Sequence, residues 1–449
     1  MVREETMRLR TSAALALLLL ASAGQRALAQ DTTTARPTGL PGKVQWEFNL
    51  DAGAGAFGFS NSLYTNVRPD PSGDLSDNWF ESFVKPKISG SYGLSKGELY
   101  GAVSAVGERT FDAPPPLVGT EASSFQVEDL YLGWRSGTSL SVGENALDFT
   151  VGRTQYRIGQ GFLLWDGGGE GGSRGGFWSN ARKAWQFAGV GRFKPKNHTF
   201  EAFYLDRDEV PENETGTRLY GGNYQLALGE NNTIGATYLH FNTDSLAARD
   251  GMSVYNLRAY VAPFKRLPGL SLGAEFARED NGDLIASTAW MAQGAYELSK
   301  VGWKPKLSYR YAFFEGDDPG TTENEGFDSL LPGFYDWGTW WQGEIAGEYF
   351  LSNSNLISHQ VRVHLTPSES LSGGLMGFVF QLDQPASFGP GVTSKDLATE
   401  LDAYADWKVN SNFLVSFVVA YGHPQEAAEQ GFGRTDDFTY GMIYVGYAY

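Results

Sequence analysis

The sequence predicts an all-β fold, a transmembrane antiparallel up-and-down β-barrel of about 18 strands. Three observations predict it. Segments in which apolar and polar residues alternate recur along most of the 449-residue chain, and a period of two is that of a β-strand. Short turns alternate with long connections between these segments, as in membrane barrels. The last segment, residues 436–449, has one apolar and aromatic face and ends on Tyr449.

The first 29 residues have the organisation of a secretory signal peptide. Arg8 and Arg10 precede an apolar run at 13–23, and Ala27-Leu28-Ala29 provides a small-x-small cleavage motif. The apolar run is too short to span a bilayer as a helix. We therefore expect a signal peptide at 1–29, cleavage before Gln30, and a single barrel domain at 30–449.

The composition restricts the class of protein and of partner. The formal net charge is −17, whereas a nucleic-acid partner requires a basic face. The chain has no cysteine, which excludes disulfides, thiol nucleophiles and thiolate metal sites. Its 56 glycines and 14% aromatic residues suit strands that alternate between lipid and water.

Eighteen segments alternate as strands do, and their usual length of roughly ten residues or more matches a tilted membrane-crossing strand. They are residues 44–58, 79–94, 97–108, 125–135, 146–153, 184–194, 198–208, 218–228, 232–242, 252–262, 270–279, 285–298, 303–314, 355–366, 371–382, 397–409, 412–423 and 436–449.

One stretch is ambiguous. Residues 339–350 could form a nineteenth strand, but an odd count would move the short turns at 366–370 and 410–411 to the side of the long loops. We therefore assign 315–354 to one large external loop, and keep a strand at 339–350 as the alternative.

In several of these strands the charged residues share one parity. A charge on the lipid face costs about 2–4 kcal/mol at mid-membrane, so this parity should face the lumen. Val361 and Arg362 illustrate the alternation in one strand; in another, Trp185 should face lipid and Gln186 the lumen. The resulting candidates for a substrate path are Arg153, Arg157, Arg192, Arg258, Arg310, Arg362, Asp129 and Asp402.

The lumenal charges can be interpreted in two ways. The arginines and carboxylates could pair across the interior and only rigidify the barrel. As a set, however, they favour an anion path, because Arg grips a carboxylate through two parallel hydrogen bonds. A barrel of about 18 strands is wide enough for an aqueous channel, and nearby carboxylates would keep anion binding weak enough for conduction.

The final strand resembles the ending of bacterial outer-membrane barrel proteins, in which this strand closes the barrel and carries the assembly signal. The resemblance implies a multi-pass protein of the Gram-negative outer membrane. Outer-membrane lipid and lipopolysaccharide would then surround the chain.

Residues 127–134 and 149–159, followed by a Gly-rich loop with Trp165 and Trp178, resemble the alginate-export family of outer-membrane proteins. Residues 327–332 look like that family's second recognisable segment, and Arg153 matches its Gly-Arg position. Two departures are Ile158, where the family has a tyrosine, and residues 180–185, where it tends toward an aspartate. The resemblance implies an 18-stranded barrel with an electropositive lumen that passes an acidic exopolysaccharide outward.

The leading functional expectation is thus passive, anion-selective passage, most simply export of an acidic exopolysaccharide such as alginate, with periplasmic export components as partners. The alternatives are a specific uptake porin for small acids or sugars, a membrane-embedded hydrolase, and a structural or adhesive barrel. The five histidines form no metal-spaced motif, and no catalytic residue, metal or cofactor is expected.

Two loop segments can each be interpreted in two ways. Residues 315–328 carry six carboxylates, which could bind a divalent cation or form a solvated acidic loop. The aromatic residues at 334–341 could stack on sugar rings or pack within the barrel mouth.

Overall fold

A computed structural model describes residues 42–61, 77–112, 121–229, 232–333, 342–346, 352–433 and 436–449. Within them, one antiparallel sheet of 18 strands closes on itself, because β1 pairs with both β2 and β18. The strands are β1 (Val44–Ser60), β2 (Asp77–Gly93), β3 (Glu98–Phe111), β4 (Ala122–Arg135), β5 (Leu147–Thr154), β6 (Trp185–Phe193), β7 (His198–Asp206), β8 (Arg218–Ala227), β9 (Thr233–Asn242), β10 (Ser253–Val261), β11 (Leu270–Asp280), β12 (Ala286–Glu297), β13 (Lys306–Phe314), β14 (Leu356–Leu365), β15 (Leu371–Gln381), β16 (Asp396–Lys408), β17 (Phe413–Pro424) and β18 (Phe438–Ala448). The predicted fold class and strand count are confirmed.

Each strand pairs with its neighbours in sequence, so the topology is up-and-down. The predicted strand ends lie within three residues of the observed ones. The start of β13 moves from 303 to Lys306 because Trp303 and Lys304 have φ of 65° and 43°, a left-handed turn conformation that cannot continue a strand. Two short helices, α2 (Pro385–Phe388) and α3 (Glu426–Phe432), lie in the connections at the long-loop end.

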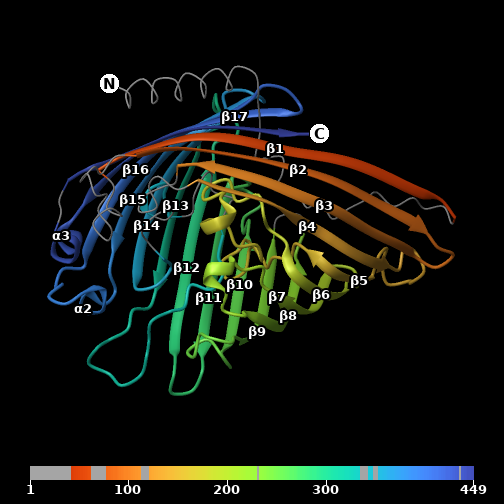
Figure 1. Ribbon diagram of the computed structural model, residues 1–449, viewed down its shortest axis with the longest axis horizontal. Helices are drawn as coiled ribbons and strands as arrows, with labels where there is room; N and C mark the ends of the chain where they lie inside the picture. Colours follow the sequence, from red (N-terminus) through yellow and green to blue (C-terminus); the bar gives the residue numbers. More distant parts are fainter. Residues whose placement is uncertain are drawn as a thin grey trace.

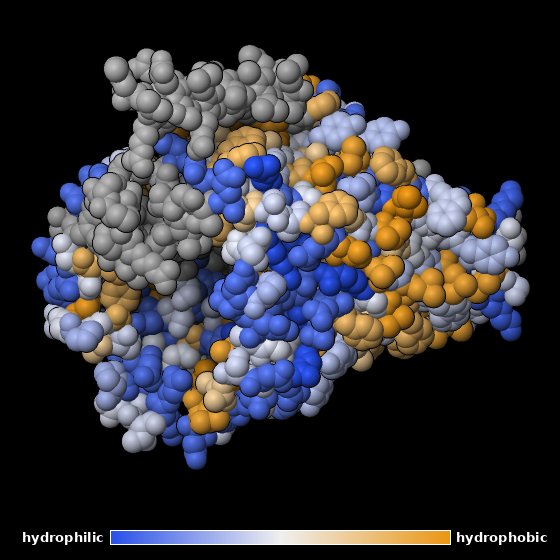
Figure 2. Space-filling view, in the orientation of Figure 1, coloured by the Kyte–Doolittle hydropathy of each residue, from blue (hydrophilic) through white to orange (hydrophobic). Residues whose placement is uncertain are grey.

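The outer surface carries the apolar residues of the strands. Leu257 is 62% exposed and Val361 57%, whereas their neighbours Arg258 and Arg362 are 5% and 7% exposed. Figure 2 shows hydrophobic side chains gathered on the right-hand part of the molecule, where Figure 1 draws β1 to β5. An apolar outside around a polar inside is the arrangement that a bilayer requires of a β-barrel.

One parity prediction is wrong. Trp185 is fully buried inside the barrel and Gln186 is exposed on the outside. The register of β5 and β6 shifts between Gly152 and Thr154, so that β6 holds one extra residue there. Such a bulge reverses the side of every residue before it.

A second bulge lies in β4. Its register with β3 shifts between Val103 and Ala105, and the neighbouring residues Glu128 and Asp129 both point inward as a result. The bulge places two carboxylates in the lumen next to each other, which strict alternation does not allow.

The lumen contains three inward-folded loop segments. Residues 155–184 follow β5, and residues 315–333 follow β13; they pair with each other through a parallel bridge between Leu164 and Leu331. Residues 342–346, the third segment, form a turn with Ile345 fully buried. Figure 1 shows the yellow segment after β5, with its 3-10 helix Gly172–Arg174, inside the ring of strands.

These loops share a core with the inner wall. Phe162 stacks on Phe314 of β13 at 5.7 Å, and Trp178 contacts Tyr444 of β18 at 5.0 Å between ring centroids. The assignment of 315–354 to a loop agrees with the 18-stranded sheet. Among the described residues, no helix is long and apolar enough to cross a membrane. The expected signal peptide and the aromatic residues at 334–341 lie outside the described residues.

Candidate functional site: the charged lumen

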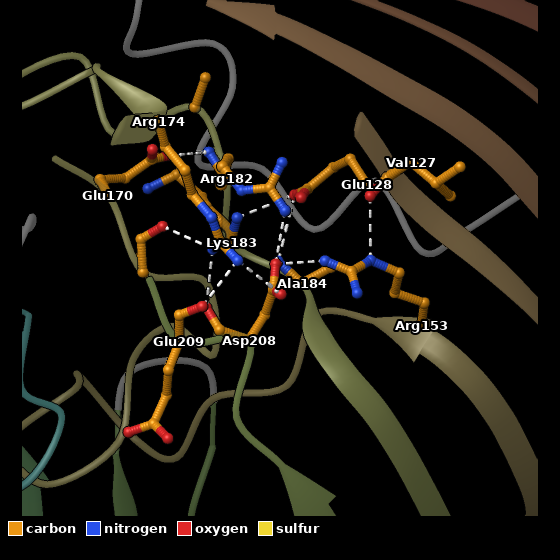
Figure 3. Close-up of polar contacts among 12 residues, drawn as sticks. Val127, Glu128, Arg153, Glu170, Arg174, Arg182, Lys183, Ala184, Asp208 and Glu209 are labelled. Atoms are coloured by element: carbon orange, nitrogen blue, oxygen red, sulfur yellow. Dashed lines mark hydrogen bonds and ion pairs between the residues drawn. The ribbon is translucent and has the colours of Figure 1, made fainter. Parts of the chain in front are cut away.

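Arg153 belongs to an ion cluster that attaches the loop 155–184 to the barrel. It lies near the end of β5 and donates to Asp208 and, from Nε, to the carbonyl of Val127 at 3.0 Å. Arg174 and Arg182 of the loop donate to the same carboxylate. Figure 3 shows the guanidinium groups of all three arginines directed toward Asp208.

Asp208 lies in the connection between β7 and β8. Burial opposes ionisation of its carboxyl group, but the hydrogen bond from Arg182 and the charges of Arg153, Arg182 and Arg174 outweigh burial and hold the pKa of Asp208 below its ordinary value. Because three cations converge on one anion, Arg153 is engaged in structure rather than open to a substrate.

Arg157 differs from Arg153 in being exposed. Its guanidinium lies over the ring of Trp165, 4.6 Å from the centroid, in the geometry of a cation–π contact. In the described part of the chain, no carboxylate lies within ion-pair distance of it. The guanidinium of Arg157 is therefore accessible, on a loop that folds into the barrel.

Arg192 and Arg258 lie beside the same loop. Arg192 donates to Glu201 at 2.8 Å, and Asn223 donates to the other oxygen of that carboxylate at 2.6 Å. Arg258 in turn donates to Asn223 at 2.6 Å and to Thr237 at 2.8 Å. A hydrogen-bonded chain thus runs from Arg192 to Arg258 across β6 to β10.

Gly159 brings the loop onto this chain. It has φ of +57°, and a Cβ atom built there would lie 3.0 Å from Nε of Arg258. A side chain at this position would strain the backbone and collide with the guanidinium. The structure therefore places Arg157, Arg192 and Arg258 in one region of the lumen.

Arg310 and Arg362 lie on a different part of the wall. Arg310 of β13 is 2% exposed and pairs in register with Gln360 of β14. Arg362 donates from Nε to the hydroxyl of Tyr404 at 2.8 Å. Both side chains have the predicted inward direction, but the strands that carry them are not those of Arg157 and Arg258.

The two predicted carboxylates do not neutralise an arginine. Asp129 lies 3.3 Å from Nζ of Lys87 and accepts a hydrogen bond from Ser104 at 2.6 Å. Asp402 accepts the backbone N–H of Glu344 at 3.2 Å, and no ion pair to it is found among the described residues.

Sequence reasoning missed a group of wall carboxylates that hold the loops through backbone N–H groups. Glu81 accepts from Trp178 and Ser179, Glu128 from Lys183 and Ala184, and Glu400 from Ile345 and Ala346, at 2.8 Å each. Buried backbone donors must be paired, so these glutamates allow irregular backbone to lie inside the barrel. Their lumenal parity was the available signal, but parity does not tell which partner a carboxylate takes.

Carboxylates of the acidic loop 315–328 bind groups within the loop and one arginine outside it. Asp317 accepts the backbone N–H of Glu325 at 3.2 Å, Asp318 that of Gly320 at 2.8 Å, and Asp328 pairs with Arg249. No group of three or more carboxylates or histidines suited to a metal ion occurs among the residues described.

Four histidines lie on the outer face, each with a hydrogen-bonding partner. His198 contacts Tyr224, His240 contacts Ser253, His359 contacts Tyr309, and His423 contacts Asp437. The fifth, His364, faces the lumen beside Arg362 and Tyr404.

No protein-family model matches the chain, and no curated protein matches it. Solved structures do. OccAB2 of Acinetobacter baumannii aligns with a TM-score of 0.57 at 13% identity, over 90% of this chain and 98% of that one. The outer membrane protein OpdK of Pseudomonas aeruginosa aligns with a TM-score of 0.53 at 12% identity, over 90% and 99%. OpdK has also been determined with vanillate, and that structure aligns with a TM-score of 0.52 at 12% identity, over 90% and 98%.

These neighbours correct the family expectation. The barrel shares its fold with solved Occ and Opd proteins, among them the outer membrane protein OpdK, and the resemblance to the alginate-export family is wrong. The fold and the apolar outer face agree with the expected outer-membrane location. The residues that suggested alginate export have structural tasks instead: residues 149–159 lead into the lumenal loop, and residues 327–332 pair with it.

Proposed function

We propose that this barrel is an outer-membrane channel for passive, anion-selective uptake of small molecules, and that organic carboxylates are the class it favours. The observation that carries the proposal is Arg157, an exposed lumenal guanidinium stacked on Trp165 with no carboxylate within ion-pair distance among the described residues. Guanidinium groups bind carboxylates in a planar, two-point geometry.

The loops inside the barrel support the proposal that its substrates are small. The segments 155–184, 315–333 and 342–346 all lie against the inner wall, and their residues Phe162, Leu331 and Ile345 are at most 7% exposed. A lumen occupied in this way leaves less room than an open barrel of 18 strands. The neighbour OpdK, determined with vanillate, shows that a barrel of this fold has been observed together with a small aromatic carboxylate.

The hydrogen-bonded chain from Arg192 to Arg258 lies next to Arg157. Its two arginines are balanced by two carboxylates, since Glu201 accepts from Arg192 and Glu275 of β11 lies directly opposite Arg258 in register. The positive charge of this region that remains is that of Arg157, and charged side chains that line a lumen set its ion selectivity.

A flux assay with a matched substrate pair tests this proposal. Liposomes that contain the purified barrel take up vanillate and its neutral amide, which differ only in the charged group. We expect several-fold faster uptake of the carboxylate, and the difference should shrink in high salt because salt screens the attraction. Equal rates for the two compounds, or faster uptake of the amide, would contradict the proposal; protein-free liposomes give the background.

A further inference from the structure

His364 forms a compact group with Arg362 and Tyr404 on the inner wall near the short-turn end of β14. The hydroxyl of Tyr404 lies 2.7 Å from Nδ1 of His364 and 2.8 Å from Nε of Arg362. Nδ1 of His364 also lies 3.3 Å from Nη2 of Arg362. The strand ends at Leu365, where the short turn 366–370 begins, so the group faces the periplasmic end of the lumen.

One arrangement of protons satisfies these contacts with a neutral His364. A guanidinium can only donate, so Arg362 donates to the oxygen of Tyr404. The hydroxyl hydrogen of Tyr404 can then point to Nδ1 of His364, which accepts it. The ring is therefore neutral in this arrangement, with its proton on Nε2.

Protonation of His364 would change this arrangement. A protonated ring carries N–H on both nitrogens and cannot accept from Tyr404. It would also place a second positive charge beside Arg362. The guanidinium would then be repelled from its present position, and the periplasmic end of the lumen would gain positive charge.

Charged residues near His364 lie on β13 and β16 as well as on its own strand. On β13, Lys306 is directly opposite in register and exposed. On β15, the opposite residue is Gly374, which has no side chain and leaves room for the hydroxyl of Tyr404. On β16, Asp402 and Asp406 flank Tyr404 on the same face, but they accept from the backbone of Glu344 and from Ser416.

We propose that His364 is a specificity-determining residue, whose protonation raises the anion selectivity of the channel as the pH falls. The proposal rests on the anion-selective function proposed above. Histidine is the side chain that ordinarily changes charge between pH 5 and pH 8, and charged side chains that line a lumen set its ion selectivity.

The test compares the chloride-to-potassium permeability ratio at pH 8 and pH 5, from reversal potentials in planar bilayers. In the wild type we expect the ratio to rise about twofold as the pH falls. The variants H364Q and H364N keep hydrogen-bonding capacity without the charge, and the rise should be lost in both. The matched control is H359Q, because His359 belongs to the same strand but contacts Tyr309 on the outer face; it should keep the full rise.

The outcomes separate this inference from the proposed function. A wild-type channel that is anion-selective at pH 8 but shows no rise at pH 5 would overturn the role of His364, and so would an undiminished rise in both His364 variants. A wild-type channel that prefers cations at pH 8 would overturn the proposed function itself. Heat-modifiable mobility on electrophoresis checks that each variant has formed its barrel.

Discussion

At the scale of the residue, lumenal position alone does not make an arginine part of a substrate path. Arg153 and Arg157 are four positions apart, yet Arg153 binds Asp208 whereas Arg157 is exposed over Trp165. The difference arises because the fold brings the Asp208 carboxylate to Arg153, whereas no carboxylate among the described residues lies within ion-pair distance of Arg157. Only the arginine without such a partner can bind a substrate without first breaking an internal ion pair.

Arg157→Gln should weaken carboxylate binding. The substitution keeps a polar side chain of similar length but removes the charge, and a hydrogen bond to a charged group contributes about 1.5–3 kcal/mol, so half-blocking concentrations of vanillate should rise about tenfold or more. Current block in planar bilayers measures them. Arg278→Gln is the control, because Arg278 lies on the outer parity of β11 and donates to the carbonyl of Ala286 at 3.4 Å. Equal block in the wild type and in Arg157→Gln would contradict the role of Arg157.

Asp208→Asn should loosen the loop 155–184. The amide leaves three guanidinium groups around a neutral acceptor, and removal of one partner from a buried ion pair costs about 3–5 kcal/mol. Hydrogen exchange of the loop amides should therefore accelerate by a factor of roughly a hundred or more. Asp244→Asn is the control, because its pair with Arg218 is exposed and such pairs contribute about 0–1 kcal/mol.

The stability of the loop 155–184 should depend on pH through the carboxyl group of Asp208. The pKa of Asp208 in the folded protein is below its ordinary value. Ionisation of Asp208 therefore stabilises the folded state fully at pH values above the unfolded pKa of about 3.9. This stabilisation is lost as the pH falls through the lower pKa of the folded state. Loop protection, corrected for intrinsic exchange, should be constant from pH 7 to about pH 5 and should decline below about pH 4. A decline centred near pH 6 would contradict this role of Asp208.

At the scale of the element, two bulges decide what the strands present to the lumen. The extra residue in β4 turns Glu128 inward next to Asp129, and the extra residue in β6 turns Trp185 inward. Glu128 then holds the end of the loop 155–184 by its backbone, and the indole of Trp185 donates to the carbonyl of Tyr156 at 2.9 Å. Both bulges therefore lie where the loop is attached.

Glu400→Ala should release the segment 342–346. Glu400 accepts the backbone N–H groups of Ile345 and Ala346, and a buried donor left without a partner costs about 1–3 kcal/mol. Single-channel conductance should rise, or become noisier, as the segment leaves the wall. The control is Thr399→Ala, one residue away on the outer parity of β16; an identical current trace for Glu400→Ala and the wild type would contradict the anchoring role.

At the scale of the whole molecule, alternation predicts the barrel well and its contents poorly. Eighteen strands and the pairing of the last strand with the first follow from period-two patterns and loop lengths, which are local properties of the chain. The inward direction of Arg258, Arg310 and Arg362 follows from the same patterns. The position of the loops does not, since it depends on contacts between distant segments, such as the pairing of Leu164 with Leu331.

The family expectation failed for a related reason. A Gly-Arg strand followed by a loop rich in glycine and tryptophan describes the local sequence, and here those residues pack a loop into the lumen and bring Gly159 onto Arg258. The same residues fit channels for different substrates. The parity of the arginines therefore predicts an anion path, whereas the size of the substrate depends on how the loops occupy the lumen.

The reversal potential of the purified barrel in a potassium chloride gradient at pH 8 tests the central claim most directly. The account predicts a reversal potential displaced toward the chloride equilibrium potential. This displacement should become smaller when a small carboxylate such as vanillate occupies the lumen. A potential displaced toward the potassium equilibrium potential would contradict it.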